Sequence, residues 1–114
     1  MATIKSYSDL QQSKKLAEIL PIESADMYWW SSGKKYYIEA MDDGDFNEGE
    51  GHIRAWSLAA LLSVLPEIQG GKPIIALDDN YITYPHMSDL HTKADNPIDA
   101  CYEMIIKLNE QKLL

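Results

Sequence analysis

The most regular pattern of hydrophobic and polar positions lies near the end of the chain. Asn96-Pro97 supplies a helix cap followed by a first helical residue, and apolar residues then recur at helical spacing, with charged residues on the opposite face. The pattern predicts an amphipathic helix that packs its apolar face into the core. That face consists of Ile98, Cys101, Tyr102, Ile105 and Leu108.

Two shorter helices are predicted upstream, each followed by a proline. The first is expected over residues 6–20, because Ser6 and Asp9 have the spacing of a capping box. The apolar residues in this range lie along one stripe. The second is expected to begin at a cap, Ser57, and to run to Leu65.

Two hairpins separate the predicted helices. The first joins the aromatic-rich segments 27–30 and 35–41 across a turn that contains Gly33, and the second joins 73–77 to 81–84. Consecutive hairpins favour an antiparallel sheet, and amphipathic helices can cover one side of it. We therefore expect a two-layer α+β fold with the order α-ββ-α-ββ-α.

An acidic segment follows the first hairpin. Residues 42–51 carry five carboxylates and no basic residue, which is typical of a solvated loop. Asp43, Asp45 and Asn47 have the alternating spacing of calcium ligands. The positions at which an EF-hand requires glycine and glutamate hold other residues. We therefore expect no metal in this loop.

A second polar stretch, residues 85–95, contains the other candidate metal ligands. His86, Asp89 and His91, with Cys101 further along the chain, match the spacing of no established zinc site. We expect a surface loop here, a buried thiol at Cys101, and no cofactor. A small metal-dependent enzyme built on this stretch or on the acidic loop is an alternative function.

Composition excludes several classes of protein. The 114 residues include 18 acidic and 10 basic ones, which gives a net charge of −8. Proteins that bind nucleic acids need Lys and Arg against phosphates, and this chain has a single arginine, so we expect no direct nucleic-acid binding and no membrane association. The first residues lack the apolar segment of a signal peptide. A single domain over residues 1–114, located in the cytoplasm, is expected.

Large aromatic residues occur on both faces of the first hairpin. If Ser32-Gly33 is the turn, Trp29 pairs with Tyr36 on one face. Tyrosine and tryptophan are common anchors at protein interfaces. Either another element covers the opposite face or that face binds another protein or a second copy of the chain. The predicted protein-binding residues on it are Tyr28, Trp30 and Tyr37.

Three segments of the sequence resemble one family. They are residues 12–21 with 23–27, residues 55–66, and residues 95–104, and they coincide with the predicted helices and their caps. The family consists of small proteins of Bacteroides-type bacteria, commonly encoded in prophage and other mobile-element regions. The resemblance implies a small phage-associated cytoplasmic protein, and it supplies no catalytic motif.

These features together favour a non-enzymatic accessory protein that acts by binding another protein. No set of residues in the sequence places an acid, a base and a nucleophile together. The alternative that uses the negative charge is a DNA-mimic inhibitor of a host defence enzyme. Eight net charges on 114 residues are sparse for a surface that imitates a phosphate backbone.

Overall fold

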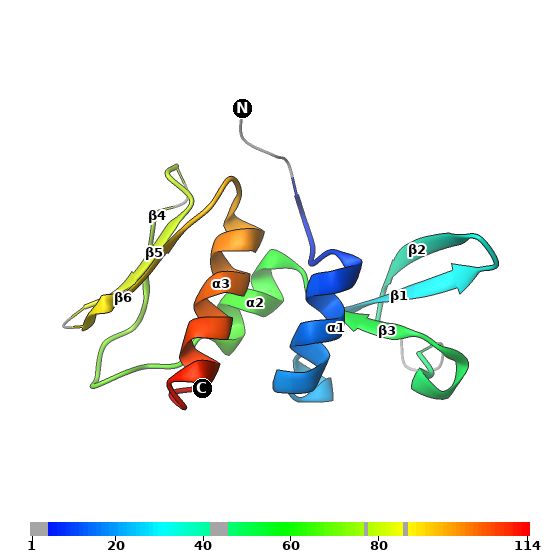
Figure 1. Ribbon diagram of the computed structural model, residues 1–114, viewed down its shortest axis with the longest axis horizontal. Helices are drawn as coiled ribbons and strands as arrows, with labels where there is room; N and C mark the ends of the chain where they lie inside the picture. The colour runs from blue at the N-terminus through cyan, green and yellow to red at the C-terminus, as the bar shows by residue number, and fades with distance from the viewer. Residues whose placement is uncertain (1–4, 42–45, 77, 86) are drawn as a thin grey trace.

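The computed structural model describes residues 5–41, 46–76, 78–85 and 87–114, and it places three helices between two small sheets (Figure 1). The elements in chain order are α1 (Leu10–Ile19), η1 (Ile22–Ser24), β1 (Met27–Ser32), β2 (Lys35–Ala40), η2 (Glu48–Glu50), β3 (Ile53–Ala55), α2 (Leu58–Val64), β4 (Ile74–Ala76), β5 (Tyr81–Tyr84), β6 (Met87–Lys93) and α3 (Pro97–Glu110).

The α+β class and the alternation of helices with antiparallel hairpins are confirmed. The hairpins do not share one sheet, however: each belongs to a separate three-stranded sheet. β3 pairs with β1, which gives the order β2-β1-β3, and β6 pairs with β5, which gives the order β4-β5-β6. In Figure 1 the two sheets lie on opposite sides of the helices.

β6 corrects the prediction of a surface loop over residues 85–95. In its second half, buried Leu90 and Thr92 alternate with exposed His91 and Lys93. This is the period of a strand with one buried face. The hydroxyl of Thr92 donates to the carbonyl oxygen of Ala100 at 2.8 Å, so a polar residue occupies a core position and hides the strand pattern in the sequence.

The start of α1 also differs from the prediction. The N-cap is Asp9, and its capping-box partner is Gln12 rather than Ser6. The backbone N–H of Ser8 donates to the carbonyl oxygen of Trp56 at 2.8 Å, and the backbone N–H of Trp56 donates back to Oγ of Ser8. Tyr7 and Ser8 are therefore held beside Trp56 and Ser57, and the helix begins later than expected.

The core is centred on α3. Four of the five predicted core residues on this helix are fully buried, whereas Tyr102 is only partly buried and Met104 is buried in addition. Each of the other two helices and the second sheet contributes to the same cluster. Its largest members outside α3 include Leu16, Trp56, Leu61, Ile82, Tyr84 and Leu90.

Candidate functional site

The distal part of the β1–β2 hairpin extends beyond the rest of its sheet. β3 pairs only with Met27, Tyr28 and Trp29 of β1, so from Trp30 onward β2 is the one strand beside β1 in the described structure. We call residues 30–37 the hairpin arm. All of its residues after Trp30 are exposed, and Figure 1 shows it projecting away from the helices.

The register of this hairpin differs by two residues from the predicted one. Trp29 pairs with Ile38 rather than with Tyr36, which makes Gly33-Lys34 the two-residue turn. Turns that match the twist of a hairpin need a positive φ at their first central position, and Gly33 supplies it with a φ of 74°. A shift of two leaves every side chain on its predicted face.

The first predicted binding residue, Tyr28, is covered. Its side chain is 3% exposed, its ring stacks on His52 with centroids 5.1 Å apart, and Phe46 meets it edge-on at 5.8 Å. Its hydroxyl donates to Oε2 of Glu39 at 2.9 Å. The alternative of a covered aromatic face therefore holds at the base of the hairpin.

The other two predicted residues lie together on the arm. Trp30 and Tyr37 are cross-strand partners whose rings stack with centroids 4.8 Å apart and an interplanar angle of 27°. Tyr37 is 44% exposed and Trp30 is half-buried. Nε1 of Trp30 is buried and has no hydrogen-bond partner among the described residues. An unpaired buried N–H costs about 1–3 kcal/mol.

The opposite face of the arm carries a further exposed aromatic residue. Tyr36 is 46% exposed, so each face of β2 presents one tyrosine to solvent. β2 is also an edge strand, since β1 is its only strand neighbour in the described ranges. The predicted register placed Tyr36 beside Trp29 on the opposite face, away from the predicted binding residues. The edge position of β2 results from the pairing of β3 with the other side of β1, which no local sequence pattern indicates.

The base of the hairpin is fixed to the helical layer through Trp29. Its Nε1 donates to the carbonyl oxygen of Ser8 at 3.2 Å, and its ring meets Tyr7 edge-on with centroids 5.6 Å apart. Ser8 in turn precedes the cap of α1 and bonds to Trp56. The arm is therefore a projecting segment on an anchored base.

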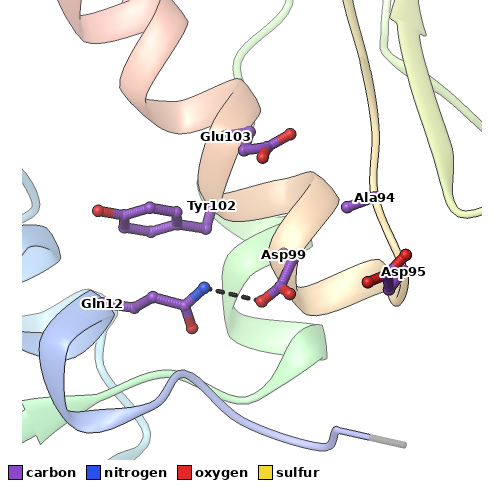
Figure 2. Close-up of a pocket in the computed structure, with 6 residues that line it drawn as sticks. All are labelled: Gln12, Ala94, Asp95, Asp99, Tyr102 and Glu103. Carbon is purple, nitrogen blue, oxygen red and sulfur yellow. Dashed lines mark hydrogen bonds between the residues drawn. The ribbon is translucent and has the colours of Figure 1, made fainter. Parts of the chain in front are cut away.

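A pocket of about 340 Å³ between the starts of α1 and α3 is a second candidate (Figure 2). Oδ1 of Asp99 accepts hydrogen bonds from Lys5 at 2.7 Å and from Gln12 at 2.8 Å, and Oδ2 accepts one from Asn96 at 3.0 Å. Burial alone would raise the pKa of Asp99, but these three donors outweigh it and lower that pKa.

The contacts of Asp99 assign this pocket a structural role. Lys5 also donates to Asp9, the cap of α1, and Asn96 is the cap of α3. The carboxylate therefore ties the N-terminal segment to the first turns of two helices. Two further acidic residues on the pocket wall, Asp95 and Glu103, add negative charge to it.

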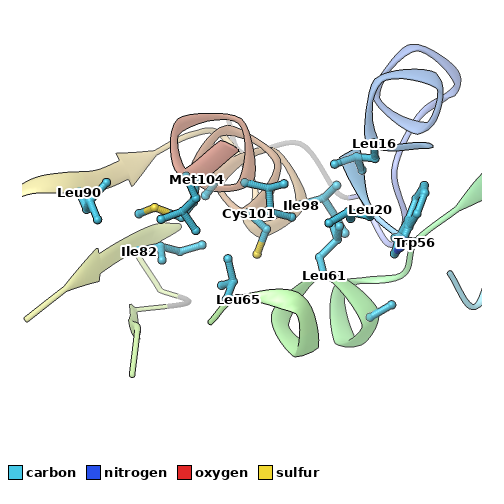
Figure 3. Packing of buried hydrophobic residues seen from close by; sticks show 14 of the residues in the cluster. Leu16, Leu20, Trp56, Leu61, Leu65, Ile82, Leu90, Ile98, Cys101 and Met104 are labelled. Atoms are coloured by element: carbon cyan, nitrogen blue, oxygen red, sulfur yellow. The ribbon is translucent and has the colours of Figure 1, made fainter. Parts of the chain in front are cut away.

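Cys101 is a core residue, as predicted. The thiol points into the packed cluster between α3 and α2 (Figure 3). Burial raises its pKa to about 12. A thiol in this environment stays protonated at neutral pH and is a poor nucleophile.

The candidate metal ligands are only partly described. Asp43, Asp45 and His86 lie outside the described residues, and nothing is shown of the side chain of Asp89. His91 lies on β6 and its ring stacks on Tyr81 with centroids 6.2 Å apart. In the described part of the chain, no three His, Cys, Asp or Glu residues are close enough to share a metal ion.

The single arginine is part of the scaffold. The guanidinium of Arg54 donates to Oε1 of Glu48 at 2.8 Å and to the carbonyl oxygens of Ala17 and Leu20 at 3.1 and 3.2 Å. It thereby binds the carbonyl end of α1.

None of the helices in the described ranges has the length and apolar character needed to cross a membrane.

No family model, no curated protein and no solved structure matches this chain. A functional interpretation therefore depends on the geometry of the hairpin arm.

Proposed function

We propose that this chain is a non-enzymatic accessory protein, of the phage or mobile-element type that its sequence resembles, and that it acts by binding another protein through the hairpin arm. The observation that carries the proposal is the stacked pair of Trp30 and Tyr37. This pair lies where the sheet is two strands wide and where neighbouring residues are exposed.

The stacking favours binding because it orders the aromatic surface in advance. Immobilising a flexible side chain at an interface costs about 0.5–1.5 kcal/mol. Trp30 and Tyr37 already hold each other across the two strands, so a partner that covers them meets a preformed surface. Aromatic anchors of this kind contribute large buried area with few rotamers to restrict.

The unpaired N–H of Trp30 adds a second reason. A buried donor without an acceptor destabilises the isolated chain. A partner that shifts the indole and offers a carbonyl oxygen to Nε1 removes that cost. The hydrogen bond would then contribute to affinity as well as to orientation.

Capture from a lysate of the host bacterium tests the proposal. The chain is immobilised as wild type, as Trp30→Ala and as Tyr37→Ala, and captured proteins are quantified by mass spectrometry. The matched control is Ile74→Ala, which truncates a 56% exposed residue on β4 in the other sheet. We expect both arm variants to lose captured proteins that the control retains. Equal capture by all four proteins would contradict the proposal.

A further inference from the structure

The hydrogen-bonding pattern of β2 identifies which of its backbone groups are free. The backbone N–H of Met41 donates to the carbonyl oxygen of Asp26 at 2.8 Å, and these residues continue the β1–β2 register. Hydrogen-bonded pairs alternate along an antiparallel ladder. Lys35, Tyr37 and Glu39 therefore direct their backbone groups toward β1. Tyr36, Ile38 and Ala40 direct theirs toward the open edge.

This alternation of backbone groups limits how the β2 edge can pair with the β2 edge of a second copy. In an antiparallel pair, opposite residues must both point their backbone groups toward each other. A two-fold axis that joins two β2 edges must then pass beside a residue, such as Tyr36, Tyr37 or Ile38, and not between two residues. A register in which Tyr36 faces Glu39, for example, is excluded because Glu39 bonds toward β1.

Charge distinguishes among the three registers. An axis at Tyr37 places Lys35 of each copy opposite Glu39 of the other, on the same face, twice in the pair. An axis at Tyr36 places Lys35 opposite Tyr37, and an axis at Ile38 places it opposite Met41. Lys35 forms no ion pair with any residue that the structure describes, and it is exposed, as is Glu39.

We propose that two copies of this chain associate by antiparallel pairing of their β2 strands about a two-fold axis at Tyr37. The inference goes beyond the proposed function: it assigns the edge of β2 to a second copy of the chain, whereas the stacked face of Trp30 and Tyr37 is the surface proposed for another protein. The β2-β1-β3 sheets of the two copies would then join, through their β2 strands, into one continuous six-stranded sheet. Tyr36 of each copy would exchange backbone hydrogen bonds with Ile38 of the other.

The same axis extends the aromatic stack. Trp30 lies opposite Tyr37 within one chain, and the axis brings the two Tyr37 side chains side by side. The joined sheet would carry a row of four aromatic rings on one face, Trp30 and Tyr37 from each copy. Cross-strand aromatic pairs stabilise a sheet, so this row favours the axis at Tyr37.

β4, an edge strand of the other sheet, has features that discourage pairing with a further strand. It is three residues long and directly follows Pro73. β2 is twice that length, contains no proline and carries Tyr36, Tyr37 and Ile38 in succession. Its one lysine, Lys35, would discourage pairing with most strands, but in this register Glu39 of the other copy neutralises its charge.

A charge exchange tests the pairing and its register together. Sedimentation velocity over a range of concentrations should show wild type forming a dimer, and Lys35→Glu and Glu39→Lys each weakening it by about tenfold or more. An equimolar mixture of the two variants should form a heterodimer, because each pair of positions 35 and 39 across the axis then holds opposite charges, one pair as in wild type and the other reversed. Since the mixture contains the same two folded variants, recovered association cannot arise from changed stability.

Disulfide trapping supplies the second test. Tyr37→Cys under a mild oxidant should give a covalent dimer, because the axis brings the two substituted positions together. Tyr36→Cys, equally exposed on the same strand, is the matched control and should cross-link far more slowly. A wild type that stays monomeric, or variants that dimerise like it, would overturn the inference. The broader proposal fails separately, through equal lysate capture by the arm variants and Ile74→Ala.

Discussion

Trp30 stacks on Tyr37 across the β1–β2 hairpin, with ring centroids 4.8 Å apart, immediately beyond the last residue of β1 that pairs with β3. A two-stranded segment is marginally stable in water without additional packing. The stacked pair therefore has two consequences. It stabilises the arm in the isolated chain, and it presents an ordered aromatic surface to a partner.

Two substitutions of Trp30 distinguish the contribution of its ring to stability from that of its N–H group. Trp30→Phe retains a stacked ring and removes the unpaired Nε1 donor, so the free energy of unfolding should stay the same or rise by up to about 1 kcal/mol. Trp30→Ala removes the stack and should cost about 0.5–1.5 kcal/mol beyond the lost buried area. Urea denaturation measures both. A loss above about 1 kcal/mol in Trp30→Phe would show that the donor has a partner.

Truncation of one buried side chain on α3, Ile105, tests whether this face of the helix lies at the centre of the core. Ile105 is fully buried, and Ile105→Ala should lower the free energy of unfolding by about 2–5 kcal/mol because it leaves a cavity. Ile74→Ala, at a 56% exposed position, should change it by less than about 0.5 kcal/mol. Equal effects of the two substitutions in urea denaturation would show that this face of α3 is not the centre of the core.

Asp99 predicts a specific acid sensitivity. Its pKa is lowered in the folded chain, so its contribution to stability is fully present above the unfolded value of about 3.9 and is lost as the pH falls through the folded value. Wild type should therefore exceed Asp99→Asn in stability at pH 7, and the difference should shrink below about pH 4. Exposed Asp95, on the same pocket wall, provides the control variant Asp95→Asn. A pH-independent difference in thermal melting would argue against this network.

Cys101 should be chemically inert in the folded chain. Its thiol is buried and its pKa is raised to about 12, so both access and ionisation are unfavourable at pH 8. Iodoacetamide should modify it only after unfolding in denaturant. Mass spectrometry of the native protein after overnight treatment measures this, and rapid stoichiometric alkylation without denaturant would contradict the burial.

The sequence predicted what local signals determine. Asn96-Pro97 and the apolar stripe after it fixed α3, since a cap and a helical period need no information from distant residues. Gly33 located the first turn to within one position, and the face of Tyr28, Trp30 and Tyr37 followed from alternation along the strands.

The remaining features depend on distant contacts. β6 was not predicted because the polar residue Thr92 occupies one of its buried positions. Its hydroxyl is satisfied there by a hydrogen bond to Ala100 on α3, a contact that the sequence does not indicate. The cover over Tyr28 comes from Phe46, within the acidic segment, and from His52, directly after it. The open edge of β2 exists because β3 joins the far side of β1. None of these pairings leaves a local pattern, so the site could be predicted only as an aromatic face.

Amide hydrogen exchange of β2 at several protein concentrations tests the central claim most directly. Residue-resolved NMR should show the N–H of Tyr37 protected at every concentration, because it bonds within the hairpin. The N–H groups of Tyr36 and Ile38 should exchange rapidly in dilute solution and become protected as the concentration rises, because they then bond to a second copy. Rapid exchange of both amides at all concentrations would contradict the proposed pairing of the arm.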